Sequence, residues 1–311
     1  MVKRYPLFVL LSLILVSLPF VGCKKKEASP PSKQARVSAT NAYEKYFGPA
    51  PTTDKGTCYA FVIYFPSAKE PGKVVPFPFF TFDEGSIKKV ALERLLTGME
   101  VGSYRGEIAQ PFASGTRILG VTEQQGAVAV NFSKEILASK ADDAIERAIL
   151  NAIVLTLSQF NGVKEVRVQV EGKEGGVIDG KEIGKFLGHG GLEKQPLTPT
   201  KTAVLKPSQP RLLSVTAMKD KGAKEVEEVE EVNAFFDRPV DIKELKMTDK
   251  DGRPFEGEVF HSVFDMAAVL KPKEPSIFKG GMPVKVRWKV TDKLGRQAEG
   301  ESEFSLDVKE H

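Results

Sequence analysis

The sequence has little of the chemistry from which metal centres are built. It contains two cysteines, three histidines and one tryptophan among 311 residues. No two histidines lie close together in the chain, so the ligand spacing typical of zinc sites is missing. If one cysteine carries a lipid, no disulfide can form within the chain. These shortages favour a binding or scaffold protein without a metal or other cofactor.

The chain also lacks a strong charge of either sign. Its 45 Lys and Arg residues and 41 Asp and Glu residues give a formal net charge of +4. Lys3 and Arg4 belong to a segment that we expect to be removed, so the mature chain is closer still to neutral. A nucleic-acid-binding protein needs a clustered basic face, which is not indicated. Hydrophobic residues make up 41% of the chain and charged residues 28%, as in ordinary globular proteins.

The amino terminus has the parts of a bacterial export signal. After a basic start, residues 7–18 form an apolar run shorter than the roughly 20 residues that span a membrane. Phe20, Val21 and Gly22 then precede Cys23. This pattern resembles the lipobox, although Phe20 stands where Leu is usual. The resemblance implies that a signal peptidase recognises Phe20, Val21 and Gly22 and that Cys23 is lipidated, with palmitate among its acyl chains.

Two or more acyl chains hold a protein stably at a membrane. We therefore expect a lipid anchor at the outer face of the cytoplasmic membrane, or on the periplasmic side of the outer membrane if the cell has two. The alternatives are an uncleaved anchor and an ordinary secretory signal in which Cys23 is incidental.

Composition divides the chain into five parts. Two of them are expected to fold, one as an α+β domain and the other as an all-β domain. The expected parts are a signal peptide (1–22), a flexible tether (23–51), an α+β domain (52–192), a Pro-rich linker (193–210) and an immunoglobulin-like β-sandwich (211–311). Within the tether, a short helix that carries Tyr43, Tyr46 and Phe47 and docks back is the alternative.

In the α+β domain, β-rich runs are predicted to flank two helices. Strands are expected at 58–65, 74–82, 116–121, 127–132 and 163–171, and helices at 86–97 and 142–160. The second helix is apolar on more than one side, so it is predicted to be buried. Its charged first turn leaves too short an apolar run to span a membrane.

These elements carry a family resemblance. Residues 115–121 (GTRILGV) and 126–135 (GAVAVNFSKE) resemble the paired signature of the GerMN domain, and residues 156–160 (TLSQF) and 166–172 resemble the end of its long helix and its closing strand. The helix around 95–98 fits as well, although Met99 replaces a proline. The family occurs in exported lipoproteins of sporulating bacteria and actinobacteria. The resemblance implies a non-enzymatic domain for envelope assemblies; we carry over no sporulation role.

Beyond the linker, seven short strands are expected, which indicates a sandwich with Trp288 in its core. Their ranges are 212–217, 232–236, 245–248, 255–259, 266–270, 284–290 and 301–308. Residues 235–241 and 284–304 resemble CopC-type domains, and the Gmad2 module is the alternative family. The copper-binding members have histidine where this chain has Arg296. A guanidinium is not a normal metal ligand, so a periplasmic metal-binding protein is disfavoured.

Other motifs that suggest chemistry are incomplete. Residues 175–181 have the spacing of a phosphate-binding loop, but Glu182 stands where a hydroxyl residue is required. His189 lies in a Gly-rich stretch similar to an esterase oxyanion loop, yet the chain has no G-x-S-x-G nucleophile motif. Cys58 begins an apolar strand, which favours burial, although a reactive thiol stays open. His261 is expected to be structural, and His311 is the terminal residue of the given sequence.

The sequence thus predicts a lipid-anchored envelope protein that is not an enzyme and has no catalytic, cofactor or metal site. Its partners would be the membrane, through the anchor, and an envelope protein or a second copy of the chain, with no nucleic acid and no identified small-molecule substrate. The alternatives are an exported enzyme, or a hydrolase accessory that binds wall polymer, and the metal-binding protein.

Overall fold

The computed structural model describes residues 35–53, 56–83, 85–98, 108–139, 143–184, 194–207, 209–220, 228–262 and 264–310. The expected signal peptide and Cys23 lie outside these ranges. Two hydrophobic cores are formed, one in an α+β domain (the first domain) and one in a β-sandwich (the second domain). No helix among these residues is long and apolar enough to cross a membrane.

The first domain contains two main sheets and three α-helices. The sheet orders are β2-β1-β3-β4 and β5-β6-β7. The elements are β1 (Ala35–Ala39), α1 (Asn41–Phe47), β2 (Thr52–Thr53), β3 (Cys58–Pro66), β4 (Val74–Thr81), α2 (Ile87–Thr97), β5 (Ile118–Gln124), β6 (Ala127–Phe132), α3 (Asp143–Ser158), β7 (Glu165–Val170), β8 (Val177–Ile178) and β9 (Lys181–Glu182).

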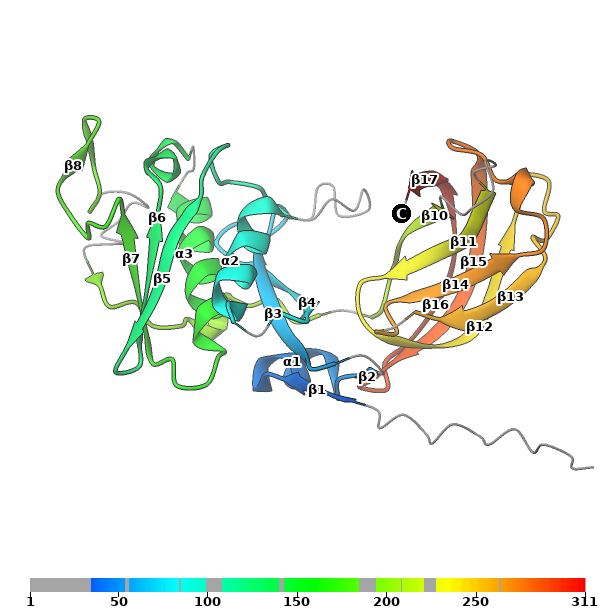
Figure 1. Ribbon diagram of the computed structural model, residues 1–311, viewed down its shortest axis with the longest axis horizontal. Coiled ribbons are helices and arrows are strands. Elements are labelled where there is room, and N and C mark those ends of the chain that lie inside the picture. The colour runs from blue at the N-terminus through cyan, green and yellow to red at the C-terminus, as the bar shows by residue number, and fades with distance from the viewer. Residues whose placement is uncertain are drawn as a thin grey trace, which may run out of the picture. The chain divides into compact units, whose positions relative to one another are not determined.

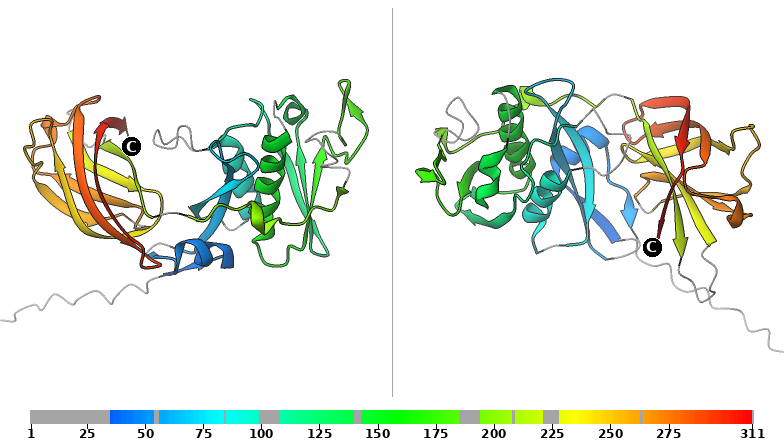
Figure 2. Two further views of the ribbon diagram at one scale, coloured as in Figure 1. Left: turned by 180° about the vertical axis from the view of Figure 1, so that it is seen from behind. Right: turned by 90° about the horizontal axis from the view of Figure 1, so that it is seen from above.

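Helices α2 and α3 lie between the two sheets (Figures 1 and 2). Ile149 and Ile153 of α3 and Leu92 of α2 are fully buried there, because both sides of the helix pair face apolar strands. The β5–β6 hairpin turns at Gln125 and Gly126, both with positive φ, which is the backbone twist that a two-residue hairpin needs. The predicted helices and hairpin are confirmed.

The flexible tether predicted for residues 23–51 is wrong over Ala35–Phe47. β1 runs parallel to β3, with Val37 opposite Cys58, and the Thr40 hydroxyl accepts a bond from the Tyr43 amide to begin α1. Tyr43 and Phe47 are buried in the core. Burial of two aromatic side chains stabilises a segment whose polar composition suggested a spacer.

The linker predicted at residues 193–210 is bonded to the first domain. Leu197 exchanges two backbone hydrogen bonds with Val166 of β7, of 2.8 and 3.1 Å, and the Leu205 amide donates to the Val74 carbonyl of β4 at 2.9 Å. The Gln195 side chain also bonds to both backbone groups of Val168. The segment therefore covers strand edges of this domain.

The second domain is a sandwich of two sheets, with strand orders β13-β14-β11-β10-β17 and β12-β15-β16. The strands are β10 (Leu212–Asp220), β11 (Glu228–Phe236), β12 (Val240–Thr248), β13 (Gly257–His261), β14 (Ala267–Pro272), β15 (Pro283–Asp292), β16 (Gln297–Ser305) and β17 (Asp307–Glu310). The predicted sandwich is confirmed, except that the expected last strand is two, β16 and β17, which pair with different sheets.

The core of the sandwich forms as the alternation on β15 predicts. Val284, Val286 and Val290 are fully buried, and the Trp288 ring meets Phe236 of the facing sheet edge to face, with centroids 5.6 Å apart. Charged residues occupy the outer positions of the same strand, so one face of this sheet is solvated.

Candidate functional site

A change of sheet within two residues lies beside a hollow of the second domain. The amide of Phe255 donates to the Met247 carbonyl of β12 at 3.0 Å, whereas the carbonyl of the next residue, Glu256, accepts from the Lys273 amide beyond β14 at 2.9 Å. The chain therefore leaves one sheet and joins the other between Phe255 and Glu256. The two sheets separate at this point, because neighbouring residues are bonded to opposite layers.

Gly257 makes this crossing possible. A Cβ placed on Gly257 would lie 2.2 Å from the Lys271 backbone oxygen and 2.7 Å from the Leu270 side chain. Any larger residue would push β13 away from β14. Upstream, the Asp249 carboxylate accepts from the amides of Asp251 and Arg253 and fixes the turn that delivers the chain to this point.

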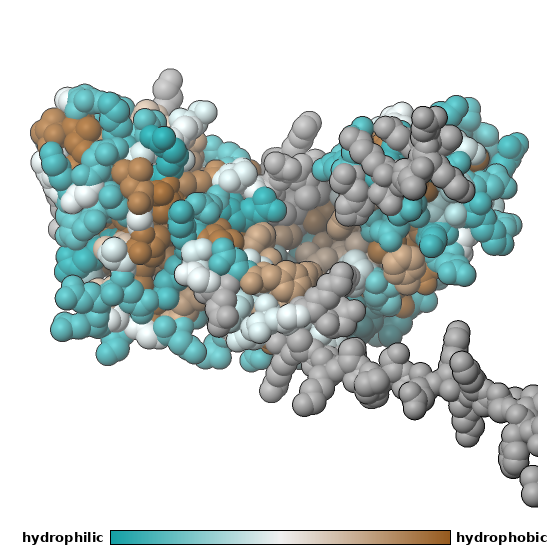
Figure 3. Space-filling view, in the orientation of Figure 1, coloured by the Kyte–Doolittle hydropathy of each residue, from teal (hydrophilic) through white to brown (hydrophobic). Residues whose placement is uncertain are grey.

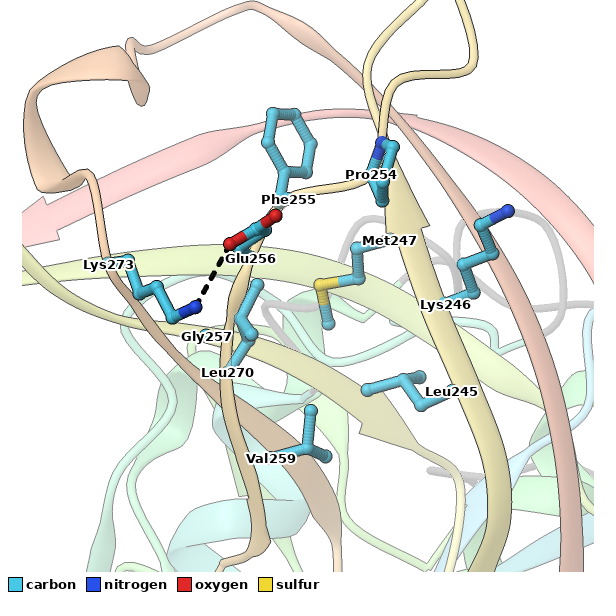
Figure 4. Close-up of a pocket in the computed structure, with 10 residues that line it drawn as sticks. All are labelled: Leu245, Lys246, Met247, Pro254, Phe255, Glu256, Gly257, Val259, Leu270 and Lys273. Atoms are coloured by element: carbon cyan, nitrogen blue, oxygen red, sulfur yellow. Dashed lines mark hydrogen bonds and ion pairs between the residues drawn. The ribbon is translucent and has the colours of Figure 1, made fainter.

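We call the resulting hollow the edge groove. It lies between the edge strands β12 and β13 and has a volume of about 450 Å³. Figure 4 shows apolar side chains from both strands and from β14 directed into it, with charged groups at the rim. The lining residues are Leu245, Lys246, Met247, Pro254, Phe255, Glu256, Gly257, Val259, Leu270 and Lys273.

The rim of the edge groove carries charge but no reactive arrangement. Lys273 and Glu256 form an ion pair of 3.0 Å with both side chains about 70% exposed, so the pair contributes little to stability. Among the described residues no group of three metal-ligating side chains occurs. What the groove offers is a surface of mixed apolar and charged side chains between two strand edges.

The edge of β13 is exposed on both faces. Val259 is 49% exposed and Phe260 41% exposed, and they point to opposite faces because side chains alternate along a strand. Within the described part of the chain, β13 pairs with β14 alone. An edge of this kind, apolar and unpaired, is a template for pairing with another strand.

The backbone of β13 has a fixed alternation. The Glu256 carbonyl accepts from the Lys273 amide, and the Ser262 amide donates to the Ala267 carbonyl. Both residues are therefore bonded toward β14. In an antiparallel ladder the residues between such pairs alternate, so Glu258 and Phe260 also bond toward β14. The N–H and C=O groups of Gly257, Val259 and His261 then point to the open side.

The predicted lipidation residues lie outside the described part of the chain. These residues are Cys23, Phe20, Val21 and Gly22, and their roles stay predictions. His189 and His311 also lie outside the described part. Cys58 is fully buried at the start of β3, and burial raises the pKa of its thiol, which disfavours the reactive thiolate.

Arg296, the residue at the copper-ligand position, is held by an ion pair. Its Nε lies 2.6 Å from Oδ2 of Asp292, whose side chain is fully buried. The other carboxylate oxygen of Asp292 accepts from the Leu294 and Arg296 amides. The turn between β15 and β16 is thus built around this carboxylate.

The Gly-rich run at residues 175–181 forms the small β8–β9 hairpin, in which Asp179 and Gly180 have positive φ. Lys181 donates to the Leu137 carbonyl at 2.7 Å, so its ammonium is used within the fold. A phosphate-binding loop would connect a strand to a helix, and this segment does not.

Val259 and Phe260 were not predicted as site residues. A strand was expected over 255–259, and His261 was expected to be structural; His261 lies at the end of β13 with its Nδ1 3.8 Å from Oδ1 of Asp265. The sequence did contain a signal of an edge strand. Pro254 and Gly257 precede two consecutive apolar residues, Val259 and Phe260.

Comparison with protein families gives one match. Residues 62–176 match the Germane family, described as sporulation and spore germination. This segment runs from β3 to the turn before β8, so the chain has a GerMN domain followed by an immunoglobulin-like sandwich. A comparison with curated proteins gives no match.

Solved structures similar to the chain include GerMN domains and a CopC protein. The first GerMN domain of the sporulation protein GerM from Bacillus subtilis is 22% identical, with 46% of this chain and 94% of that chain covered and a TM-score of 0.32. The tandem GerMN domains of the same protein are 15% identical, with 64% and 58% covered and a TM-score of 0.33. CopC from Methylosinus trichosporium OB3b is 19% identical, with 33% and 97% covered and a TM-score of 0.22.

Proposed function

We propose that this protein is a lipid-anchored component of the bacterial cell envelope whose two domains assemble with other proteins and catalyse no reaction. The anchor is the acylated Cys23, and the outer face of a membrane is its location. The edge of β13 with the adjacent edge groove is the binding surface. The role is one of holding partners at the membrane.

The observation that carries this proposal is the character of the edge groove. Six of its ten lining residues are apolar, its charged groups lie at an exposed rim, and it lies beside a strand with an open backbone edge. Enzyme sites bring together an acid, a base or a nucleophile with a shifted pKa. Strand edges instead recognise polypeptide through main-chain hydrogen bonds and pockets for alternate side chains. The match to the Germane family fits a non-catalytic accessory role.

The anchor can be tested by labelling cells of the native host with an alkyne analogue of palmitate. We expect label on the wild-type chain and none on Cys23→Ser. Cys58→Ser is the matched control, since it removes the other cysteine, which is buried in the first domain, and we expect its label to be unchanged. Equal label on Cys23→Ser would contradict the anchor.

The assembly role is tested on envelopes solubilised in mild detergent. Native gel electrophoresis should place the chain, 34.1 kDa before processing, in species larger than one detergent-bound copy. Denaturation of the sample should collapse these species to the monomer. A chain that migrates as a monomer under all mild conditions would contradict the assembly role, whatever the result of the labelling.

A further inference from the structure

We propose that β13 pairs with β13 of a second copy of this chain, antiparallel and around a two-fold axis at Val259. The inference rests on the proposed assembly role and names the partner for the same surface. It joins the two five-stranded sheets of the second domains into one continuous sheet.

The backbone of β13 is self-complementary about Val259. Its open-side residues are Gly257, Val259 and His261, at equal steps on either side of the centre. Placing Val259 opposite its own copy makes a hydrogen-bonded pair, and Gly257 then faces His261 of the second copy. Each chain contributes three N–H and three C=O groups, and every one of them is paired. The residue without a side chain faces the bulky imidazole.

The inner face of this arrangement is apolar across the axis. Leu270 of β14 lies opposite Val259 in the β13–β14 ladder. The two-fold axis therefore produces a row of four side chains, Leu270 and Val259 from one copy followed by Val259 and Leu270 from the other. Val259 lines the edge groove (Figure 4), so the second copy's strand covers that groove from its open side. Burial of the half-exposed Val259 drives the pairing.

The outer face is also matched. Phe260 lies opposite Val269 of β14, and Glu258 lies opposite Lys271. In the two-fold arrangement Phe260 lies opposite Glu258 of the second copy. On its other side, Glu258 remains opposite Lys271 of its own copy. No charged group lies directly opposite another of the same sign in this row; the two copies of Glu258, like the two copies of Phe260, are diagonal neighbours across the axis, and the exposed ring of Phe260 gains a covering strand.

Several other strand edges of the described chain, those of β4, β5, β7, β16 and β17, do not offer this combination. β4 contains two prolines that cannot donate, and β7 is paired with Leu197. β5 has a bulge after Ile118 and ends in polar residues; apolar residues near it are visible on the face in Figure 3. β16 and β17 carry acidic and basic side chains on their exposed positions. Such charges disfavour strand pairing.

Cross-linking of cysteines introduced one at a time into a Cys58→Ser background tests the pairing and its register. Val259→Cys in the full chain, in native envelopes, is treated with a bismaleimide whose two maleimides are joined by two carbons. We expect a product of twice the monomer mass, because Val259 lies opposite its own copy. The two copies of His261 would be about 14 Å apart, four residues along the strand, so His261→Cys should give at least tenfold less of this product.

The matched control is Val177→Cys, since Val177 is 58% exposed but lies on β8 of the first domain. Its dimer product should be at least tenfold weaker than that of Val259→Cys. Absence of the Val259→Cys product, equal products from all three variants, or a product whose mass matches a different protein would overturn the self-pairing. None of these outcomes alters the Cys23 labelling result, and the last would leave the assembly role standing.

A substitution gives an independent measurement. Val259→Lys would place two ammonium groups side by side at the axis, and sedimentation of the detergent-solubilised chain should then show the monomer where the wild type shows the dimer. Val177→Lys should sediment as the wild type. Unchanged tryptophan fluorescence, from Trp288, will show that the second domain is still folded. A folded Val259→Lys dimer would overturn the proposal.

Discussion

Gln159 bonds to both backbone groups of Val62. Its side-chain oxygen accepts from the Val62 amide at 2.7 Å and its side-chain nitrogen donates to the Val62 carbonyl. β1 pairs with β3 only as far as Ala60, so beyond that residue the described part of the chain places no neighbouring strand along this edge of β3. Thr156, one turn earlier on α3, accepts from the Tyr64 amide in the same way. The end of α3 thus takes the place of a missing strand.

Replacing Gln159 by leucine should unfold the first domain more easily. Two buried backbone groups lose their partners, at about 1–3 kcal/mol each, so we expect the free energy of unfolding to fall by about 2–6 kcal/mol. Ser158→Ala is the matched control, because the Ser158 hydroxyl is buried without a hydrogen-bond partner among the described residues.

The measurement can separate the domains. All three α-helices described belong to the first domain, so circular dichroism at the helical band follows its unfolding. Trp288, the only tryptophan, reports on the second domain. Gln159→Leu should shift the first signal and leave the second in place, and a shift in tryptophan fluorescence alone would refute the assignment.

Gly257→Ala should destabilise the second domain. The added Cβ meets a backbone oxygen at 2.2 Å, which cannot move without displacing β14, so we expect a loss of about 1–3 kcal/mol. Gly280→Ala is the control, since its Cβ would make an ordinary 3.8 Å contact with Val308. Denaturant unfolding followed by Trp288 fluorescence compares the two. Equal midpoints would show that the close approach at Gly257 is absent.

Acid should weaken the second domain through Asp241. The hydrogen bond from the Lys293 ammonium, at 2.6 Å, holds the pKa of the Asp241 carboxyl below its usual range. A carboxyl with a lowered pKa adds stability that is fully present above its unfolded pKa, about 3.9, and is lost as the pH falls through the folded value. Asp241→Asn should therefore flatten the loss of stability below about pH 4.

The control for this prediction is Asp251→Asn, an exposed carboxyl in the turn before β13. Its acid limb should follow the wild type. Lys293 itself is half-buried, which lowers its pKa, but its bonds to Asp241 and Asp265 raise the pKa above the usual value on balance. Its contribution would be lost only at alkaline pH, so an acid limb unaltered in Asp241→Asn would contradict the ion pair.

Arg296→Met should lower the stability of the second domain. The change keeps an apolar stem but leaves the fully buried Asp292 carboxylate without its 2.6 Å partner. Loss of a charged hydrogen-bond partner costs about 1.5–3 kcal/mol. Arg253→Met, at an exposed turn position, should be within about 0.5 kcal/mol of the wild type. Denaturation followed by Trp288 fluorescence measures both; equal losses would contradict this role for Arg296.

Periodic segments were predictable from the sequence, and segments stabilised by distant strands were not. The alternation on β15 and the apolar face of α3 each encode a buried side, so their local pattern was sufficient. β1 is five residues long and depends on pairing with β3, about 20 residues later, which no local pattern reveals. The linker at Leu197 was misread for the same reason, since its partner Val166 is remote.

The candidate site was only partly predictable. The strand that became β13 was expected, and so was a surface for partners. The edge groove, however, arises because Phe255 bonds to β12 and Glu256 to β14. This crossing is defined only by the positions of both sheets, which depend on residues far away in the sequence. The exposure of Val259 could therefore not be inferred from its neighbours in sequence. Cys23 stays a sequence prediction.

The inclusion of β1 in the fold has a consequence at the bilayer. If Cys23 is acylated, 11 residues separate it from Ala35, and their fully extended contour is about 40 Å. A spacer running to residue 51 would have reached about 100 Å. The shorter contour confines the protein to a thin layer above the lipid headgroups, where neighbouring molecules meet mainly by lateral diffusion. In such a layer the local concentration is high, and even weak association between copies becomes effective.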